Sequence, residues 1–168
     1  MNYPDWIRNF LWLQTYRLQM KKPATAVQKT SAWLIIFDAR DPLQLQTAQL
    51  LKTQIYPRVC RCVAFEPERV EDWFIPLWLS QMDMRWQAPS NVKGVVADNH
   101  YAYLIQLGSD PHPCMKSLEL QAPVTYRVAI NPVKELPIYH LTCRWTEACN
   151  AAEASRRIVN QIEKYIRL

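Results

Sequence analysis

The sequence predicts an α/β fold of three layers, in which a mostly parallel or mixed central sheet is flanked by helices and preceded by an N-terminal amphipathic helix. Two observations predict this fold. First, an apolar segment at residues 33–37, a helical pattern at 41–55 and a second apolar segment at 58–65 follow one another along the chain. Strands and helices that alternate in this way build a sheet with helices on its faces. Second, the chain has 168 residues, 49% of them hydrophobic, which suits one domain with a sizeable core.

Residues 5–20 are predicted to form the N-terminal amphipathic helix. Two lysines and a proline at 21–23 suit its end, because cations favour the C-terminal end of the helix dipole and proline stops the helix. Charged and polar residues interrupt the apolar run, which argues against a signal peptide. No other stretch approaches the roughly 18 uninterrupted apolar residues of a membrane span, so we expect a cytoplasmic protein. Apolar side chains recur near one face of the helix at Trp6, Phe10, Leu13 and Met20.

Each later element has a local signal of its own. Residues 33–37 form a continuous apolar run, which is typical of a central strand covered on both faces. The helix at 41–55 has Asp41 as its N-cap and Pro42 in its first turn. The final helix begins at Asn150, with Glu153 three residues later as in a capping box. Between them we expect a strand at 58–65, a helix that begins near Pro67 and is kinked or ended by Pro76, and strands at 94–98, 101–108 and 124–130.

Composition and charge argue against two classes of function. The net charge is +5, but 20 Lys and Arg against 15 Asp and Glu are not a nucleic-acid signature unless they cluster. We therefore expect direct DNA binding to be weak or absent. Gly94 and Gly108 stand alone in the sequence, which argues against a glycine-rich phosphate loop.

The five cysteines are expected to be reduced, because their number is odd and no targeting signal precedes them. Cys60 and Cys62 would point the same way on a strand, which is a packing pattern rather than a metal clamp. His140, Cys143 and Cys149 lie close together in the sequence, but a structural zinc site needs four ligands. We therefore expect buried structural cysteines, with no metal and no cofactor.

Asp38 is the best candidate for a catalytic residue, because it ends a predicted strand, where α/β proteins place functional groups. The alternative is a loop aspartate or a cap in front of the helix at 41–55. His100, His112 and His140 each lack a second ligand or base nearby in the sequence, and His112 between two prolines is expected in a loop. No nucleophile elbow, zinc-binding histidine pair or phosphate loop is present in the sequence. The residues therefore give an enzyme no positive support.

Short motifs in a fixed order resemble one known family. Asp5-Trp6 opens an aromatic segment that ends at Lys21-Lys22-Pro23, and an apolar strand then precedes Asp41-Pro42-Leu43. Further along the chain the order continues with Pro67-Glu68-Arg69-Val70, with Ile105-Gln106-Leu107-Gly108, and with a last helix that carries Asn150, Ala154, Arg156 and Arg157. Over roughly two-thirds of its length the chain resembles the psi subunit of the bacterial DNA polymerase III holoenzyme, a small α/β accessory protein of the clamp loader. It departs from that family at Tyr16, where tryptophan is frequent, and in extra residues roughly between 109 and 145, whose structure stays open.

The resemblance implies a non-catalytic bridge in DNA replication. Residues 1–23 would bind the collar of the clamp-loader ATPase subunit, although the alternative is a helix that packs on its own sheet. A single α/β domain at 24–168 would bind a chi-like subunit, which in turn holds the single-stranded-DNA-binding protein. The expected clamp-loader contacts are Trp6, Leu11, Leu13, Tyr16, Leu18, Lys21 and Lys22. The expected chi-like contacts are those aromatic side chains of 70–86 that the core leaves exposed, among Trp73, Phe74, Trp78 and Trp86.

Three other interpretations stay open. The chain could be an unrelated α/β adaptor of another complex, for example of a secretion apparatus. It could be a small hydrolase or nucleotide-binding enzyme with a pocket formed by Asp38, Arg40 and His100. Direct DNA binding would have to use arginines that we interpret as solvated faces or partner contacts, namely Arg58, Arg61, Arg156 and Arg157.

Overall fold

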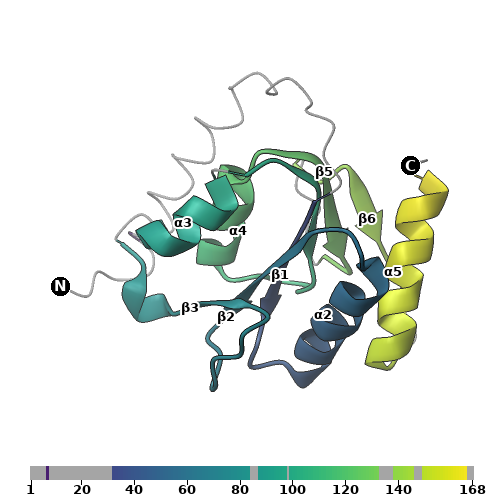
Figure 1. Ribbon diagram of the computed structural model, residues 1–168, viewed down its shortest axis with the longest axis horizontal. Coiled ribbons are helices and arrows are strands. Elements are labelled where there is room, and N and C mark those ends of the chain that lie inside the picture. The colour runs from purple at the N-terminus through teal and green to yellow at the C-terminus, as the bar shows by residue number, and fades with distance from the viewer. Residues whose placement is uncertain are drawn as a thin grey trace.

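Six parallel strands form the centre of the molecule (Figure 1). The computed structural model describes residue 7 and residues 32–83, 87–97, 99–132, 138–145 and 149–165. Within these residues the strand order is β3-β2-β1-β4-β5-β6, and every pairing is parallel. The strands are β1 (Trp33–Asp38), β2 (Cys60–Phe65), β3 (Ile75–Leu77), β4 (Tyr101–Gln106), β5 (Val124–Ile130) and β6 (Leu141–Cys143).

Helices cover both faces of the sheet, which confirms the predicted three-layer α/β fold (Figure 1). One layer consists of α2 (Pro42–Ile55) and α5 (Ala151–Tyr165), which pack against each other. The opposite layer consists of α3 (Ser90–Ala97) and α4 (Pro113–Gln121). A short 3₁₀ helix, η1 (Leu79–Gln81), follows β3.

The central strand β1 explains the continuous apolar run in the sequence. Leu34 and Ile36 belong to the core beneath α3 and α4, whereas Trp33, Ile35 and Phe37 belong to the core beneath α2 and α5. All five side chains are at most 1% exposed. Fully burying a large apolar side chain contributes about 1.5 to 3 kcal/mol, so a strand covered on both faces has no polar alternation.

The predicted unit of strand, helix and parallel strand is confirmed. β1 pairs with β2 from Trp33 opposite Cys60 to Asp38 opposite Phe65, and α2 connects the two strands. Asp41 is the N-cap of α2, with Pro42 in the first turn. Likewise, the Asn150 side chain accepts a hydrogen bond from the Glu153 amide at 2.9 Å, as expected at the start of α5.

The helix predicted to begin near Pro67 is wrong. Residues 67–74 form turns and bends, and the segment after them is the edge strand β3, which includes Pro76. Proline is tolerated there because an edge strand has one side without a ladder partner. The apolar spacing that resembled a helix face arises from packing on one core side chain: Trp73 stacks on Phe37 at 5.7 Å between ring centroids, and Phe74 meets the same ring edge-on at 6.0 Å.

The strand predicted at 94–98 is also wrong, because residues 90–97 form the helix α3. Val92 and Val96 are fully buried one helical turn apart, so their burial on the sheet outweighs the strand preference of valine. The strands predicted at 101–108 and 124–130 are present as β4 and β5. The region that the sequence left open contains α4 and β6.

The predicted helix at 5–20 and the chain division at residue 23 lie outside the described residues, apart from Ile7. Among the described helices, none combines the length and the apolar character that crossing a bilayer requires.

Candidate functional site at the carboxyl edge of the sheet

The strand order reverses between β1 and β4, at the centre of the sheet. From β1 the chain passes through α2 to β2 on one side, whereas from β4 it passes through α4 to β5 on the other. Open α/β sheets bind ligands at the carboxyl ends of the two strands where this reversal occurs. Asp38 ends β1 and Gln106 ends β4, so the residues around them form the candidate site.

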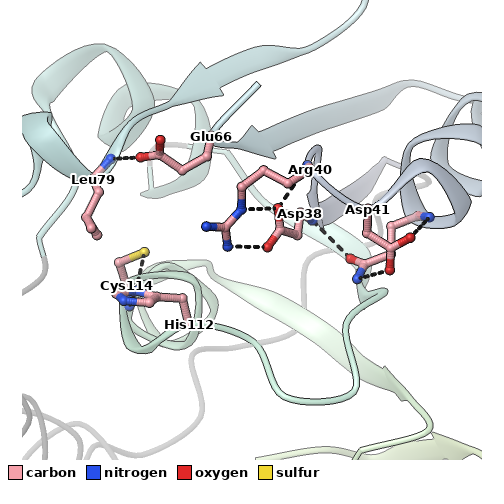
Figure 2. Close-up of polar contacts among 8 residues, drawn as sticks. Asp38, Arg40, Asp41, Glu66, Leu79, His112 and Cys114 are labelled. Carbon is pink, nitrogen blue, oxygen red and sulfur yellow. Dashed lines mark hydrogen bonds and ion pairs between the residues drawn. The ribbon is translucent and has the colours of Figure 1, made fainter. Parts of the chain in front are cut away.

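Asp38 is engaged by a nearby arginine. Its Oδ1 accepts hydrogen bonds from the Arg40 backbone N–H at 3.0 Å and from Arg40 Nε at 2.9 Å, and its Oδ2 lies 2.6 Å from Arg40 Nη2 (Figure 2). This hydrogen bonding raises the pKa of the Arg40 guanidinium, which also lies 5.1 Å above the Phe65 ring. Both carboxylate oxygens therefore face a guanidinium that stays charged, which is a poor arrangement for a general base.

The start of α2 is occupied by the carboxylate of Asp41. Its Oδ1 accepts the backbone N–H of Leu43 at 2.9 Å and that of Gln44 at 3.4 Å, and its Oδ2 accepts Gln44 Nε2 at 3.0 Å. The Gln44 Oε1 in turn accepts the Asp38 backbone N–H at 3.0 Å. In nucleotide-binding α/β proteins, a phosphate occupies this helix end. Here a fixed negative charge already bonds these amides, which disfavours a nucleotide site.

Glu66 and His112 complete the edge on the side of α3 and α4. Glu66 has φ of 49° after β2, and its carboxylate accepts the backbone N–H of Leu79 (Figure 2). His112 stacks on the Phe65 ring at 5.3 Å and caps α4, because its Nδ1 accepts the Cys114 backbone N–H at 3.3 Å. The same Nδ1 lies 3.1 Å from Cys114 Sγ. Cys114 is fully buried, so this histidine–cysteine pair serves the helix cap rather than an accessible nucleophile.

Gln106 and Gly108 close the centre of the edge. Gln106 is fully buried, and its amide has no hydrogen-bond partner among the described residues. A Cβ at Gly108 would lie 3.3 Å from Gln106 Nε2 and 3.6 Å from the Gln44 side chain, so little space remains between these groups. The sequence offered one signal for Gln106, since it is the one amide at the end of an otherwise apolar strand.

A cavity of ≈ 180 Å³ lies beside this edge, next to α2 and α5. It is lined by apolar Leu107, Ile130 and Ile158 and by the polar side chains of Asp41 and Asn131, among others. Two of its polar groups already have partners: Asp41 caps α2, and Asn131 Oδ1 accepts the Trp145 backbone N–H at 2.8 Å. Ligand pockets typically measure about 300 to 1,000 Å³, so this cavity is small for an organic substrate.

The structure separates the residues of the predicted enzyme pocket. His100 immediately precedes β4 and therefore lies at the amino edge, whereas Asp38 ends β1 at the carboxyl edge of the same parallel sheet. Asp38, Arg40 and His100 form no common pocket. In the described residues, no group of three or more His, Cys, Asp and Glu side chains could hold a metal ion. His140 Nδ1 instead accepts the Arg127 backbone N–H at 3.0 Å, and Cys143 is fully buried.

The predicted partner contacts divide between described and undescribed residues. Phe74 is 6% exposed and belongs to the core beneath α2, which removes it from a contact surface. Trp73 and Trp78 are half-buried, and Trp73 Nε1 donates to Glu71 Oε2 at 2.7 Å. Trp86 lies outside the described residues, as do the seven predicted clamp-loader contacts, Trp6, Leu11, Leu13, Tyr16, Leu18, Lys21 and Lys22.

The arginines proposed for DNA binding differ in their surroundings. Arg58, Arg61 and Arg156 are exposed, whereas Arg157 is half-buried and pairs with Glu153 at 2.5 Å. Exposed cations of this kind are the usual solvated surface of a folded domain.

A buried acid on α4, Glu119, and a half-buried arginine on β5, Arg127, are two further groups that the sequence did not indicate. Burial raises the pKa of Glu119 to about 7, against the opposing effects of Tyr139, Arg127 and Lys116. Arg127 on β5 donates to the backbone oxygens of Glu119 at 3.2 Å and Ala122 at 2.9 Å. These bonds satisfy carbonyl groups at the end of α4, so Arg127 caps this helix.

The described residues form a parallel, three-layer α/β domain. At the carboxyl edge of its sheet Asp38 pairs with Arg40 and Asp41 caps α2, and we call this the self-bonded carboxyl edge. Neither a known protein family, nor a curated protein, nor a solved structure matches the chain.

Proposed function

We propose that this chain is a non-catalytic accessory subunit of the bacterial DNA polymerase III clamp loader. It bridges the clamp-loader ATPase subunit to a chi-like subunit and, through that subunit, to the single-stranded-DNA-binding protein. The observation that carries the non-catalytic part is the carboxyl edge, where Asp38 pairs with Arg40 and Asp41 caps α2. In this proposal the domain acts through its surfaces and its terminal segment, because side chains of the edge where such folds usually bind ligands bond to one another.

The assignment to replication rests on the order of motifs in the sequence. The motif Asp41-Pro42-Leu43 falls at the start of α2, directly after β1, and the motif at Asn150 falls at the start of α5. This agrees with the places that the resemblance implies. The motif Pro67-Glu68-Arg69-Val70 falls in turns rather than at a helix start, so it adds no support.

Residues 1–23 supply the contact with the ATPase subunit in this proposal. A short amphipathic helix in the groove of a partner is a common recognition mode, and its aromatic residues are typical binding hot spots. Trp6 and Tyr16 are the aromatic anchors, with Leu11, Leu13 and Leu18 as their apolar neighbours. Lys21 and Lys22 lie at the rim of the contact and mainly tune the rate of encounter.

Trp73 and Trp78 supply the contact with the chi-like subunit. Both are half-buried, and Val70, close by in the sequence, is 61% exposed. Partly exposed tryptophans and an exposed aliphatic side chain within one short segment are the kind of side chains that a protein partner covers. Trp73 is held in place by its stacking on Phe37, so the surface is rigid before binding.

The test is an assembly experiment with purified ATPase subunit and chi-like subunit, mixed with and without this chain. The proposal predicts one complex of all three proteins that elutes together in size-exclusion chromatography, and no complex when this chain is left out. An ATPase subunit and a chi-like subunit that associate without this chain would contradict the proposal. A chain that binds neither subunit would favour the adaptor of another complex, because the self-bonded edge suits any adaptor equally well.

A further inference from the structure

Two cysteine sulfurs face each other at the amino-terminal end of β2. Cys60 and Cys62 lie two residues apart on this extended strand, and both contribute to the core beneath α2 and α5. Their Sγ atoms are 3.9 Å apart. Cys62 is 2% exposed, whereas Cys60 is half-buried and gives solvent access to the pair.

The extended strand disfavours closure of this pair into a disulfide. Successive residues of a parallel strand advance by about 3.3 Å, which places the two Cα atoms about 6.6 Å apart. That separation is at the upper end of the range of about 4.4 to 6.8 Å that disulfides span, and the sulfurs would have to approach to about 2.05 Å. The geometry therefore favours two adjacent thiols that are not bonded to each other.

The separation of the sulfurs matches two ligands of one metal ion. Thiolates about 2.3 Å from a shared ion lie roughly 3.8 Å from each other at the tetrahedral angle, and about 4.6 Å apart when the two bonds are collinear, the arrangement that a two-coordinate soft ion prefers. The observed 3.9 Å lies between these separations, so a small side-chain rotation reaches either arrangement. The two sulfurs are also preorganised, since the ladder with β1, which sets Trp33 opposite Cys60 and Ile35 opposite Cys62, fixes the backbone between them.

The ligand set selects the kind of ion. No third His, Cys, Asp or Glu joins these sulfurs among the described residues, so a closed four-ligand zinc site is not formed there. Soft thiolates with few ligands suit a soft monovalent ion, of which Cu(I) is the biological example. Lys52 near the end of α2 interacts electrostatically with Cys60, so its ammonium offsets part of the negative charge of two thiolates around one Cu(I).

We propose that Cys60 and Cys62 form a two-thiolate binding site for a soft monovalent metal ion of the Cu(I) class. On binding, each sulfur that still carries a proton releases it to solvent, two sulfur–copper bonds form, and copper stays in the +1 state. The site lies near the amino edge of the sheet, away from the self-bonded carboxyl edge, and it is independent of the proposed role in the clamp loader.

The experiment titrates the full-length chain with Cu(I) alone, without oxygen, in competition with a copper chelator of known affinity. The expected result is one equivalent bound, with a thiolate-to-copper charge-transfer band in the ultraviolet. Cys60→Ser should weaken binding by roughly 100-fold or more, the advantage that a second linked ligand provides. Because Cys60 is half-buried, the variant should keep its fold, which thermal unfolding checks.

The matched control is Cys149→Ser, since Cys149 is the other half-buried cysteine of the described residues. This variant should bind Cu(I) as tightly as the unchanged chain. Two results would overturn the proposal: a wild-type chain that binds no tighter than Cys60→Ser, or a Cys149→Ser variant that loses as much affinity as Cys60→Ser.

Discussion

The Asp41 carboxylate accepts the backbone N–H of Leu43 at 2.9 Å, at the helix end where a nucleotide-binding α/β protein would hold a phosphate. The same carboxylate accepts Gln44 Nε2, and Gln44 accepts the Asp38 backbone N–H, so one side chain links the end of β1 to the start of α2. The hydrogen bonds of this self-bonded edge therefore contribute to the stability of the fold. Their loss should lower the free energy of unfolding.

Asp41→Ala should lower the free energy of unfolding by about 1 kcal/mol, within the range of about 0.5 to 2 kcal/mol for the loss of a helix N-cap. Chemical denaturation measures this difference. The matched control is Asp110→Ala, because Asp110 is 74% exposed in its ion pair with Lys116 and such pairs contribute about 0 to 1 kcal/mol. Equal effects of the two substitutions would show that the Asp41 cap does not stabilise the edge.

Glu119 should make stability depend on pH. Burial raises its pKa from the ordinary 4.5 to about 7, so between these values the folded protein keeps a proton that the unfolded chain has lost. The contribution of Glu119 is therefore fully favourable below pH 4.5 and is lost as the pH rises to about 7. Glu119→Gln stays neutral, so its stability relative to the unchanged chain should rise by about 2 to 3 kcal/mol between pH 5 and pH 8.

Denaturation at each pH measures this difference, and the exposed Glu163 provides the control variant Glu163→Gln, which removes one carboxylate from the surface instead of from the core. A stability difference between Glu119→Gln and the unchanged chain that stays constant from pH 5 to pH 8 would mean that Glu119 is ionised throughout.

Substitutions of Phe74 and Trp78 should have different effects, the first on folding and the second on partner binding. Phe74→Ala should destabilise the domain by about 3 to 5 kcal/mol, because it empties a site in the core. Trp78→Ala should change the unfolding temperature much less and should weaken binding to the chi-like subunit by about 30-fold or more. Isothermal titration calorimetry measures the affinity. If Trp78→Ala binds the chi-like subunit as the unchanged chain does, the contact surface lies elsewhere.

Local signals were enough to predict the elements around β1. The cap at Asp41, the apolar run that follows residue 32 and the cap at Asn150 each act within a few residues, so neighbouring sequence determines them. The errors arose where distant contacts decide. β3 forms at Pro76 because it pairs with β2 at the edge of the sheet, and Val92 and Val96 are helical because the sheet lies beneath them.

The candidate site was predicted only in part, for the same reason. The position of Asp38 at a strand end follows from the sequence, but its bidentate pairing with Arg40 depends on the turn between β1 and α2. The enzyme interpretation requires His100 in one pocket with Asp38, yet the parallel pairing of β1 and β4 puts the two residues at opposite edges of the sheet. The burial of Glu119 depends on α4, a helix that the sequence did not reveal.

The affinity for the clamp-loader ATPase subunit, measured for the full chain and for a chain without residues 1–23, tests the central claim most directly. If residues 1–23 bind the ATPase subunit, the deletion should leave the unfolding temperature of the domain nearly unchanged. Trp6→Ala and Tyr16→Ala should each do the same. Each single substitution should cost about 2 to 4 kcal/mol of binding, or about 30- to 1000-fold in affinity. Tyr56→Ala, which removes an aromatic side chain that is 81% exposed on the α/β domain, should bind as the unchanged chain does. A truncated chain that keeps full affinity, or one whose domain no longer folds, would contradict the proposed role of residues 1–23.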